Sequence, residues 1–155
     1  MPSPSAESTA DGCAFCAILA GKLSVSLVHE DEQVIAFMDL RQAVPGHVLV
    51  VPRRHVETLF DLDEDTAAQL MRIALRIARA ADVAFAPDGL NLWQSNRAAG
   101  GQEVPHVHLH VQPQMSGDGL LRIYPDGAPT PTPFAALDRM AGDLRVALAR
   151  AQTSP

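Results

Sequence analysis

The residues best suited to do chemistry are three histidines that alternate with aliphatic residues between positions 104 and 113. Strict alternation predicts a strand with two different faces, so His106, His108 and His110 would project from one face about 7 Å apart. A neutral imidazole can act as a nucleophile, a proton carrier or a metal ligand near pH 7. The spacing therefore indicates a metal site, a nucleophile with its helpers, or a mixture of the two.

The only two cysteines, Cys13 and Cys16, form a local CxxC pair that is too close in sequence to link distant parts of a fold. Two thiols at this spacing are typical either of half a zinc site or of a redox pair. A redox CxxC usually follows a strand of a βαβ unit, and no strand is predicted before Cys13. Zinc is therefore the favoured interpretation.

Length and composition bound the remaining possibilities. Hydrophobic residues make up 47% of the 155, which is typical of a soluble globular protein, and we expect one domain over residues 13–155 after a disordered Pro-, Ser- and Ala-rich tail over residues 1–12. The net charge of −6 argues against a nucleic-acid surface but allows a small anionic ligand. No apolar run reaches membrane-spanning length and no signal peptide is evident, so we expect a cytoplasmic protein with no membrane partner.

Five strands and three helices are predicted to position these residues. The main helix is expected within residues 61–84, with Asp63 as its N-cap and an apolar stripe at helical spacing. Shorter apolar patterns predict one helix over residues 13–21 and another over residues 133–151. Strands are predicted over residues 24–30, 33–39, 47–52, 90–96 and 104–113.

Several motifs occur together in a distinctive order. They are CxxC before a short helix, Gly46-His47 opening a strand, Pro52-Arg53-Arg54-His55, Asn96 before Gly100-Gly101-Gln102, and the three alternating histidines. This combination resembles the histidine-triad (HIT) family of nucleotide hydrolases and transferases, over about residues 13–113. The resemblance implies an α+β fold in which a five-stranded antiparallel sheet carries the main helix. It also implies a homodimer in which two protomers join their sheets.

The resemblance further implies a reaction. The central histidine, here His108, would attack the α-phosphorus of a purine nucleotide derivative and form a nucleotidyl-histidine, from which water releases the nucleoside monophosphate. A nucleoside phosphoramidate or a dinucleoside polyphosphate is the expected substrate. His110 would hydrogen-bond the phosphoryl oxygen or carry a proton to the leaving group, and His47 would support the phosphate.

Nucleotide-binding residues also follow from the resemblance. Asp39 would accept hydrogen bonds from the ribose hydroxyls. Asn96, Gln102 and the backbone around Glu103 would complete a cradle for the phosphate. The base pocket would be lined by Phe15, Ile18, Phe37 and Leu40. Structural alternatives remain open: Asp39 as a turn cap, the apolar residues as core, and Asn96 and Gln102 as loop hydrogen-bonding residues.

Some members of the family hold a structural zinc ion. The residues that match their ligands are Cys13, Cys16, His55 and His106. Two thiolates and two imidazoles make a closed tetrahedral site, so the resemblance implies one zinc per chain that ties the N-terminal helix to the sheet.

Glu103 departs from the family pattern, because some relatives have a serine at this position. The carboxylate adds a negative charge near the expected phosphate. Two other functions remain as alternatives to a hydrolase: a purine-nucleotide-binding regulatory module with little catalysis, and a metal-binding protein that uses all the histidines. Loss of turnover in His108→Ala and a count of bound metal separate these three.

Overall fold

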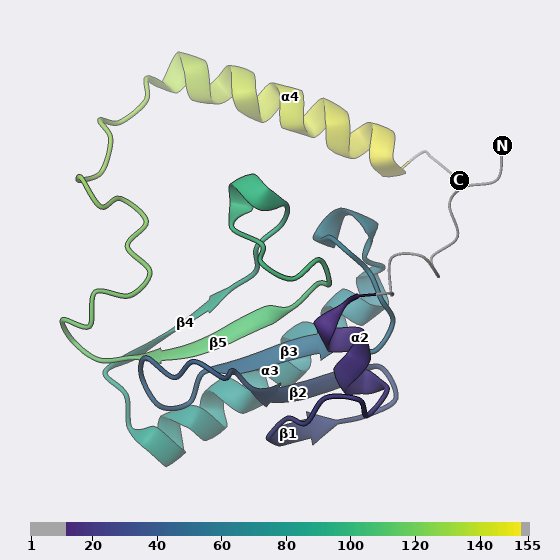
Figure 1. Cartoon of the computed structure of the whole chain (residues 1–155). Coiled ribbons are helices and arrows are strands. Elements are labelled where there is room, and N and C mark those ends of the chain that lie inside the picture. The colour runs from purple at the N-terminus through teal and green to yellow at the C-terminus, as the bar shows by residue number, and fades with distance from the viewer. Residues whose placement is uncertain (1–11, 153–155) are drawn as a thin grey trace, which may run out of the picture. The chain divides into compact units, whose positions relative to one another are not determined.

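Five antiparallel strands form one sheet in a computed structural model that describes residues 12–152 (Figure 1). The strands are β1 (Leu27–Glu30), β2 (Val34–Met38), β3 (Val48–Pro52), β4 (Gly89–Trp93) and β5 (Leu109–Gln114). They lie side by side in the order β1-β2-β3-β5-β4. With the three helices α2 (Ala14–Leu19), α3 (Glu64–Phe85) and α4 (Phe134–Gln152) among the described residues, this confirms the predicted α+β fold.

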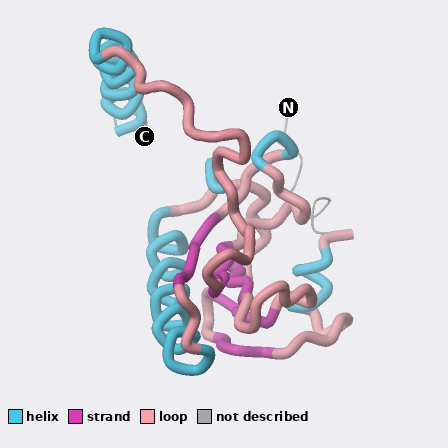
Figure 2. Tube along the Cα trace, turned by 90° about the vertical axis from the view of Figure 1, so that its left-hand side faces the viewer, coloured by secondary structure: helices cyan, strands magenta, loops and turns pink. Residues whose placement is uncertain are grey.

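The two strands β2 and β3 are continuous apolar runs because both of their faces are covered. Alternate residues of each strand therefore belong to two hydrophobic clusters. One cluster, which packs against α3, contains Val34, Ala36, Val48 and Val50. The other, which packs against α2, contains Ile35, Phe37, Leu49 and Val51. Figure 2 shows α3 on one side of the strands and the short helix α2 on the other.

Helix α3 begins where its sequence predicts. Asp63 is the N-cap, and its carboxylate accepts a 2.8 Å hydrogen bond from the Thr66 backbone N–H. Glu64 and Asp65 in the first turn favour the positive end of the helix dipole. The buried face that meets the sheet consists of Leu70, Ile73, Ala74, Ile77 and Ala81.

The strand that carries the histidines is shorter than predicted, because β5 begins only at Leu109. The backbone N–H of Val107 donates to the Val56 carbonyl at 2.7 Å rather than to a neighbouring strand of the sheet. Pro105 has no N–H to contribute to a ladder. The chain bends at residues 104–106, where the His106 N–H bonds the Val104 carbonyl at 2.8 Å, and joins the sheet only at Leu109.

The predicted alternation of faces nevertheless holds through this segment. Val107 and Val111 are fully buried in the cluster that packs against α3. On the opposite side, the Phe15 ring meets the His106 and His108 rings at centroid distances of 5.7 and 5.1 Å. The histidines therefore face the N-terminal helix, as expected of an alternating pattern.

The chain divides into two compact units after Asp118, and the second unit contains α4. The single domain expected over residues 13–155 stays a prediction, and the expected tail over residues 1–12 lies, apart from Gly12, outside the described residues. None of the described helices combines the length and the hydropathy that a membrane span requires.

Truncation of Ile73 should destabilise the fold through α3. The side chain is only 1% exposed in the cluster between the helix and the sheet. Loss of its methyl groups leaves a cavity, so Ile73→Ala should lower the free energy of unfolding by about 3 kcal/mol in urea denaturation. Met71 lies on the same helix but is 51% exposed. Met71→Ala is the matched control and should change the value by less than about 0.5 kcal/mol; equal losses would contradict this account.

Candidate active site and metal centre

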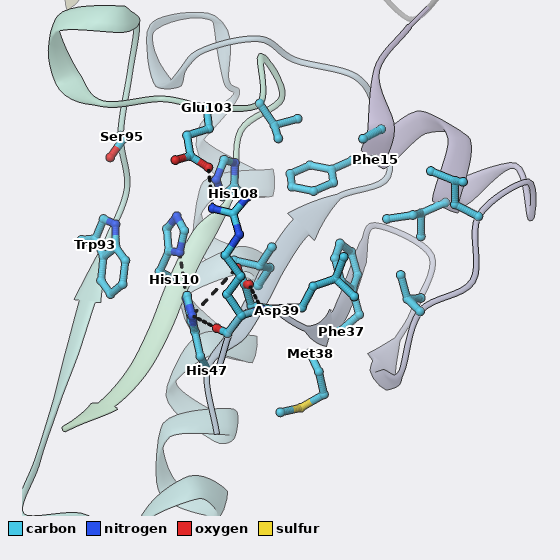
Figure 3. A pocket seen from close by; sticks show the side chains of 18 of the residues that line it. Phe15, Phe37, Met38, Asp39, His47, Trp93, Ser95, Glu103, His108 and His110 are labelled. Atoms are coloured by element: carbon cyan, nitrogen blue, oxygen red, sulfur yellow. Dashed lines mark hydrogen bonds and ion pairs between the residues drawn. The ribbon is translucent and has the colours of Figure 1, made fainter. Parts of the chain in front are cut away.

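A pocket of about 580 Å³ lies on the side of the sheet that carries α2, a size suited to a small organic ligand. Its wall combines residues of α2, the end of β2, the start of β3, the end of β4 and the histidine segment. Figure 3 shows an apolar side, with Phe15 and Phe37, and a polar side with three histidines, Asp39 and Glu103.

His108 lies between these two sides and is 5% exposed. Its Nδ1 is 2.7 Å from the backbone carbonyl oxygen of His106. A carbonyl can only accept a hydrogen bond, so Nδ1 carries the proton and Nε2 of the neutral ring keeps a lone pair. Burial lowers the pKa of His108, while the hydrogen bond to the carbonyl and the carboxylates of Asp39 and Glu103 act in the opposite direction.

His47 and His110 form a hydrogen-bonded pair beside His108. His47 Nε2 lies 2.9 Å from His110 Nδ1, and His47 Nδ1 lies 3.9 Å from the Asp39 carboxylate. The two nitrogens of His47 therefore face different partners, which favours a chain of hydrogen-bonding groups over a shared metal ion. Burial, with smaller contributions from His108 and His47, lowers the pKa of His110 to about 4, while Asp39 acts in the opposite direction.

The turn that carries Asp39 and His47 is held by the side chain of Gln42, a residue that belongs to none of the sequence motifs. The Gln42 side-chain amide donates to the backbone carbonyls of Asp39 and His47 at 2.7 and 2.8 Å. Its side-chain oxygen accepts from the N–H groups of Gly46 and His47 at 2.9 and 3.0 Å. Gln42 thus fixes both ends of the turn through the backbone.

Gly46 in the same turn is required by both conformation and space. Its φ is +105°, a region that side-chain-bearing residues rarely adopt. A Cβ at this position would lie 2.7 Å from the Phe85 ring at the end of α3 and 2.9 Å from Pro113. The backbone before His47 therefore lies directly against the end of α3 and against Pro113 of β5.

The predicted base-pocket residues are found on the apolar side. Phe15 and Phe37 are buried and meet edge to face, with ring centroids 5.6 Å apart. Ile18 lines the same wall. Leu40 also borders the pocket, but it is 96% exposed and contributes only at its rim.

Asp39 lies where the strand pattern placed it, directly after β2 at the edge of the pocket. One carboxylate oxygen accepts the Arg41 backbone N–H at 2.7 Å, as in a turn cap. The other oxygen faces His47. The residue thus combines the cap role with a place in the pocket.

The structure does not bring Asn96 and Gln102 into the pocket wall. The side-chain oxygen of Asn96 accepts the Leu59 N–H at 2.7 Å. Gln102 donates to the Glu57 carbonyl at 2.6 Å and accepts the Arg97 N–H at 2.7 Å. The alternative interpretation, loop hydrogen bonding, describes both side chains.

Glu103 lies at the pocket mouth, and its carboxylate is 3.9 Å from the Arg41 guanidinium. Both side chains are at least 80% exposed, so this surface pair adds little to stability. The pair nevertheless places one charge of each sign at the entrance.

Trp93 and Ser95 also line the pocket, although neither belongs to a sequence motif that indicates a role. Trp93 is the cross-strand partner of His110 in the pairing of β4 with β5. The alternating pattern of residues 90–96 indicated a strand but gave no information on its register, so this pairing could not be read from the sequence.

The four predicted metal ligands gather beside the pocket. The donor atoms of Cys13, Cys16, His55 and His106 all lie within 4.8 Å of one another. The Cys13 and Cys16 sulfurs are 3.4 and 3.7 Å from His106 Nδ1, and the Cys16 sulfur is 3.2 Å from His55 Nδ1. Adjacent sulfur and nitrogen ligands of tetrahedral zinc are about 3.6 Å apart. The spacing therefore fits one zinc ion.

The protonation pattern of this cluster also fits a cation. His106 Nε2 lies 2.9 Å from the Pro52 carbonyl and must donate to it, which leaves Nδ1 unprotonated and facing the sulfurs. Burial, with Cys13 nearby, raises the pKa of Cys16 to about 11. Loss of the proton from both Cys13 and Cys16 would place two negative charges side by side. A zinc ion bound between them would stabilise both thiolates.

Comparison with known proteins places the chain in a family. The family model described as "HIT domain" matches residues 21–117. "Protein hit" of Bacillus subtilis is 40% identical over 112 residues, which cover 72% of this chain and 77% of that protein.

Solved structures agree with this match. The structure of SMU.412c from Streptococcus mutans has a TM-score of 0.82 at 36% identity, covering 89% of this chain and 86% of that one. A zinc-bound histidine triad family protein from Mycobacterium smegmatis has a TM-score of 0.67 at 38% identity, covering 76% and 86%. In sequence and in fold, the chain therefore belongs to the HIT domain family.

Proposed function

We propose that this protein is a nucleotide hydrolase that cleaves the α-phosphate bond of a purine nucleotide derivative and releases a nucleoside monophosphate. The observation that carries the proposal is the state of His108. Its Nδ1 is held by a backbone carbonyl, so the lone pair of Nε2 is available in a pocket that contains two further histidines. Burial lowers the pKa of His108, which keeps the ring in its neutral, nucleophilic form.

The pocket offers a separate environment for each part of a nucleotide. The purine would lie against Phe15 and Phe37, where an apolar wall suits an aromatic base. Asp39 would accept hydrogen bonds from the ribose, since a carboxylate is an acceptor-only group. The α-phosphate would then lie next to His108 and His110.

In the proposed reaction, His108 Nε2 attacks the α-phosphorus and the bond from phosphorus to the leaving oxygen or nitrogen breaks. His110 supplies the proton that the leaving group needs, and His47 holds the His110 ring through the 2.9 Å hydrogen bond. Water then attacks the phosphorus, its proton passes to the now neutral His110, and the bond from phosphorus to His108 Nε2 breaks, which releases the monophosphate and restores the imidazole. A nucleoside phosphoramidate and a dinucleoside polyphosphate are the two substrate classes consistent with this sequence of steps.

We also propose that Cys13, Cys16, His55 and His106 hold one structural zinc ion. The site has four protein ligands and no open position, which suits a folding role rather than a chemical one. A zinc ion there would join α2 to the segment after β3 and to the histidine segment. A homodimer joined through the sheets, and a cytoplasmic location, remain predictions.

Removal of the nucleophile tests the reaction. Both an adenosine phosphoramidate and diadenosine tetraphosphate should be offered, and AMP release followed by chromatography. His108→Ala should lower release at least about 1,000-fold while AMP binding persists. His29→Ala is the matched control, because His29 lies in β1, pairs with Asp31 after that strand and does not line the pocket. Full activity in His108→Ala would rule out the nucleophile assignment, and AMP binding without turnover in the wild type would indicate a binding module.

Metal analysis tests the zinc proposal. The purified protein should contain one zinc per chain by inductively coupled plasma mass spectrometry, and Cys13→Ser should lose it. Since the ion would bind only the folded chain, its loss should lower the free energy of unfolding by at least about 3 kcal/mol. His47→Asn should retain the zinc, because His47 lies outside the cluster. Several metal ions per chain would contradict the structural assignment.

A further inference from the structure

The single tryptophan of the chain is stacked on one of the proposed catalytic histidines. Trp93 in β4 and His110 in β5 lie directly opposite each other in the strand register, so both project from the same face of the sheet. Their rings are 4° from parallel and their centroids are 4.2 Å apart. Figure 3 shows the indole beside His110, with His47 next to both.

His110 is held from two directions. The indole covers one face of its ring, and its Nδ1 is hydrogen-bonded to His47 Nε2 at 2.9 Å. Among residues 12–152, no group hydrogen-bonds His110 Nε2. His110 also lines the pocket, so its Nε2 is the nitrogen left to meet a ligand.

We propose that Trp93 is a positioning residue for His110: the indole face fixes the plane of the imidazole and stabilises its protonated form as the proton passes to the leaving group. This inference deepens the proposed hydrolase function and rests on it for the chemical step. An indole is the aromatic side chain that best attracts a cation lying over its face, so it favours the imidazolium over the neutral ring.

The charges around His110 show why such support matters. His47 faces it from the start of β3 and His108 from the segment before β5, and both disfavour a second positive charge. Asp39, after the end of β2, favours it. Burial disfavours it most strongly, so the pKa of His110 falls to about 4. A proton donor in this environment needs a group that stabilises its cation without adding another charge, and the indole is suitably placed.

Two leaving groups separate this role from a structural one. An adenosine phosphoramidate needs a proton to depart, whereas the p-nitrophenyl ester of AMP does not. Trp93→Leu should lower kcat about tenfold on the amide, with KM changed less than about threefold, and should leave the p-nitrophenyl ester within about threefold of wild type. Trp93→Phe keeps an aromatic face and should restore most of the amide activity.

The pH dependence has a definite sign. His110 must be protonated to act as an acid, so kcat on the amide falls as pH rises through its pKa in the complex. Without the indole the imidazolium is less stable, and this falling limb should move to lower pH in Trp93→Leu. Equal losses on both substrates, or a falling limb that does not move, would overturn the proposal.

Fluorescence gives a readout that needs no turnover. Protonated imidazole quenches an excited indole, and Trp93 is the only tryptophan. Its emission should fall at low pH with an inflection that disappears in His110→Asn, while circular dichroism checks that both proteins stay folded. His47, whose ring centroid is 5.6 Å from that of Trp93, is the other possible quencher, so an inflection that persists in His110→Asn but disappears in His47→Asn would overturn the coupling of Trp93 to His110. A wild type inactive on both substrates would instead refute the hydrolase function, together with the catalytic part of this inference.

Discussion

The hydrogen bond from His108 Nδ1 to the His106 carbonyl is the interaction on which the rest of the site depends. It selects the tautomer of His108 and thereby decides which nitrogen faces the pocket. The same residue, His106, turns its side chain to the two cysteines and bonds the Pro52 carbonyl through its other nitrogen. His106 thus connects the proposed nucleophile, the metal cluster and the end of β3 through its backbone and its side chain. A shift of His106 would change the geometry at all three places.

Helix α2 shows why such a connection is useful. A six-residue helix is too short to be stable alone, since nucleation costs more than one turn of hydrogen bonds returns. Phe15 holds it by packing on Phe37 and on two of the histidine rings, and Cys13 both caps the helix and belongs to the metal cluster. The apolar wall of the pocket is built on this helix, so the element most dependent on outside support also shapes the cavity.

Local signals predicted the fold well, while the details of the site depended on contacts that no local signal encodes. Asp63 with the apolar stripe of α3 predicted that helix to within a residue or two, and alternation predicted which side of the chain the histidines face. Family resemblance indicated which four donors would meet. The late start of β5 could not be predicted, because an alternating pattern shows which face of the chain each side chain lies on but not which backbone groups are hydrogen-bonded. The partner of Trp93 depends on strand register, and Asn96 and Gln102 were drawn into loop hydrogen bonds by backbone groups distant in sequence.

Gly46 touches no part of the pocket, yet the turn before His47 can be built only without a side chain there. The crowding comes from the half-exposed Phe85 and the buried Pro113, and neither residue has a proposed chemical role. An alignment of relatives that share this turn should therefore show glycine at the position as faithfully as any histidine. A glycine conserved at this position would result from the close approach of the Gly46 backbone to the end of α3. It would not indicate a catalytic role for the residue.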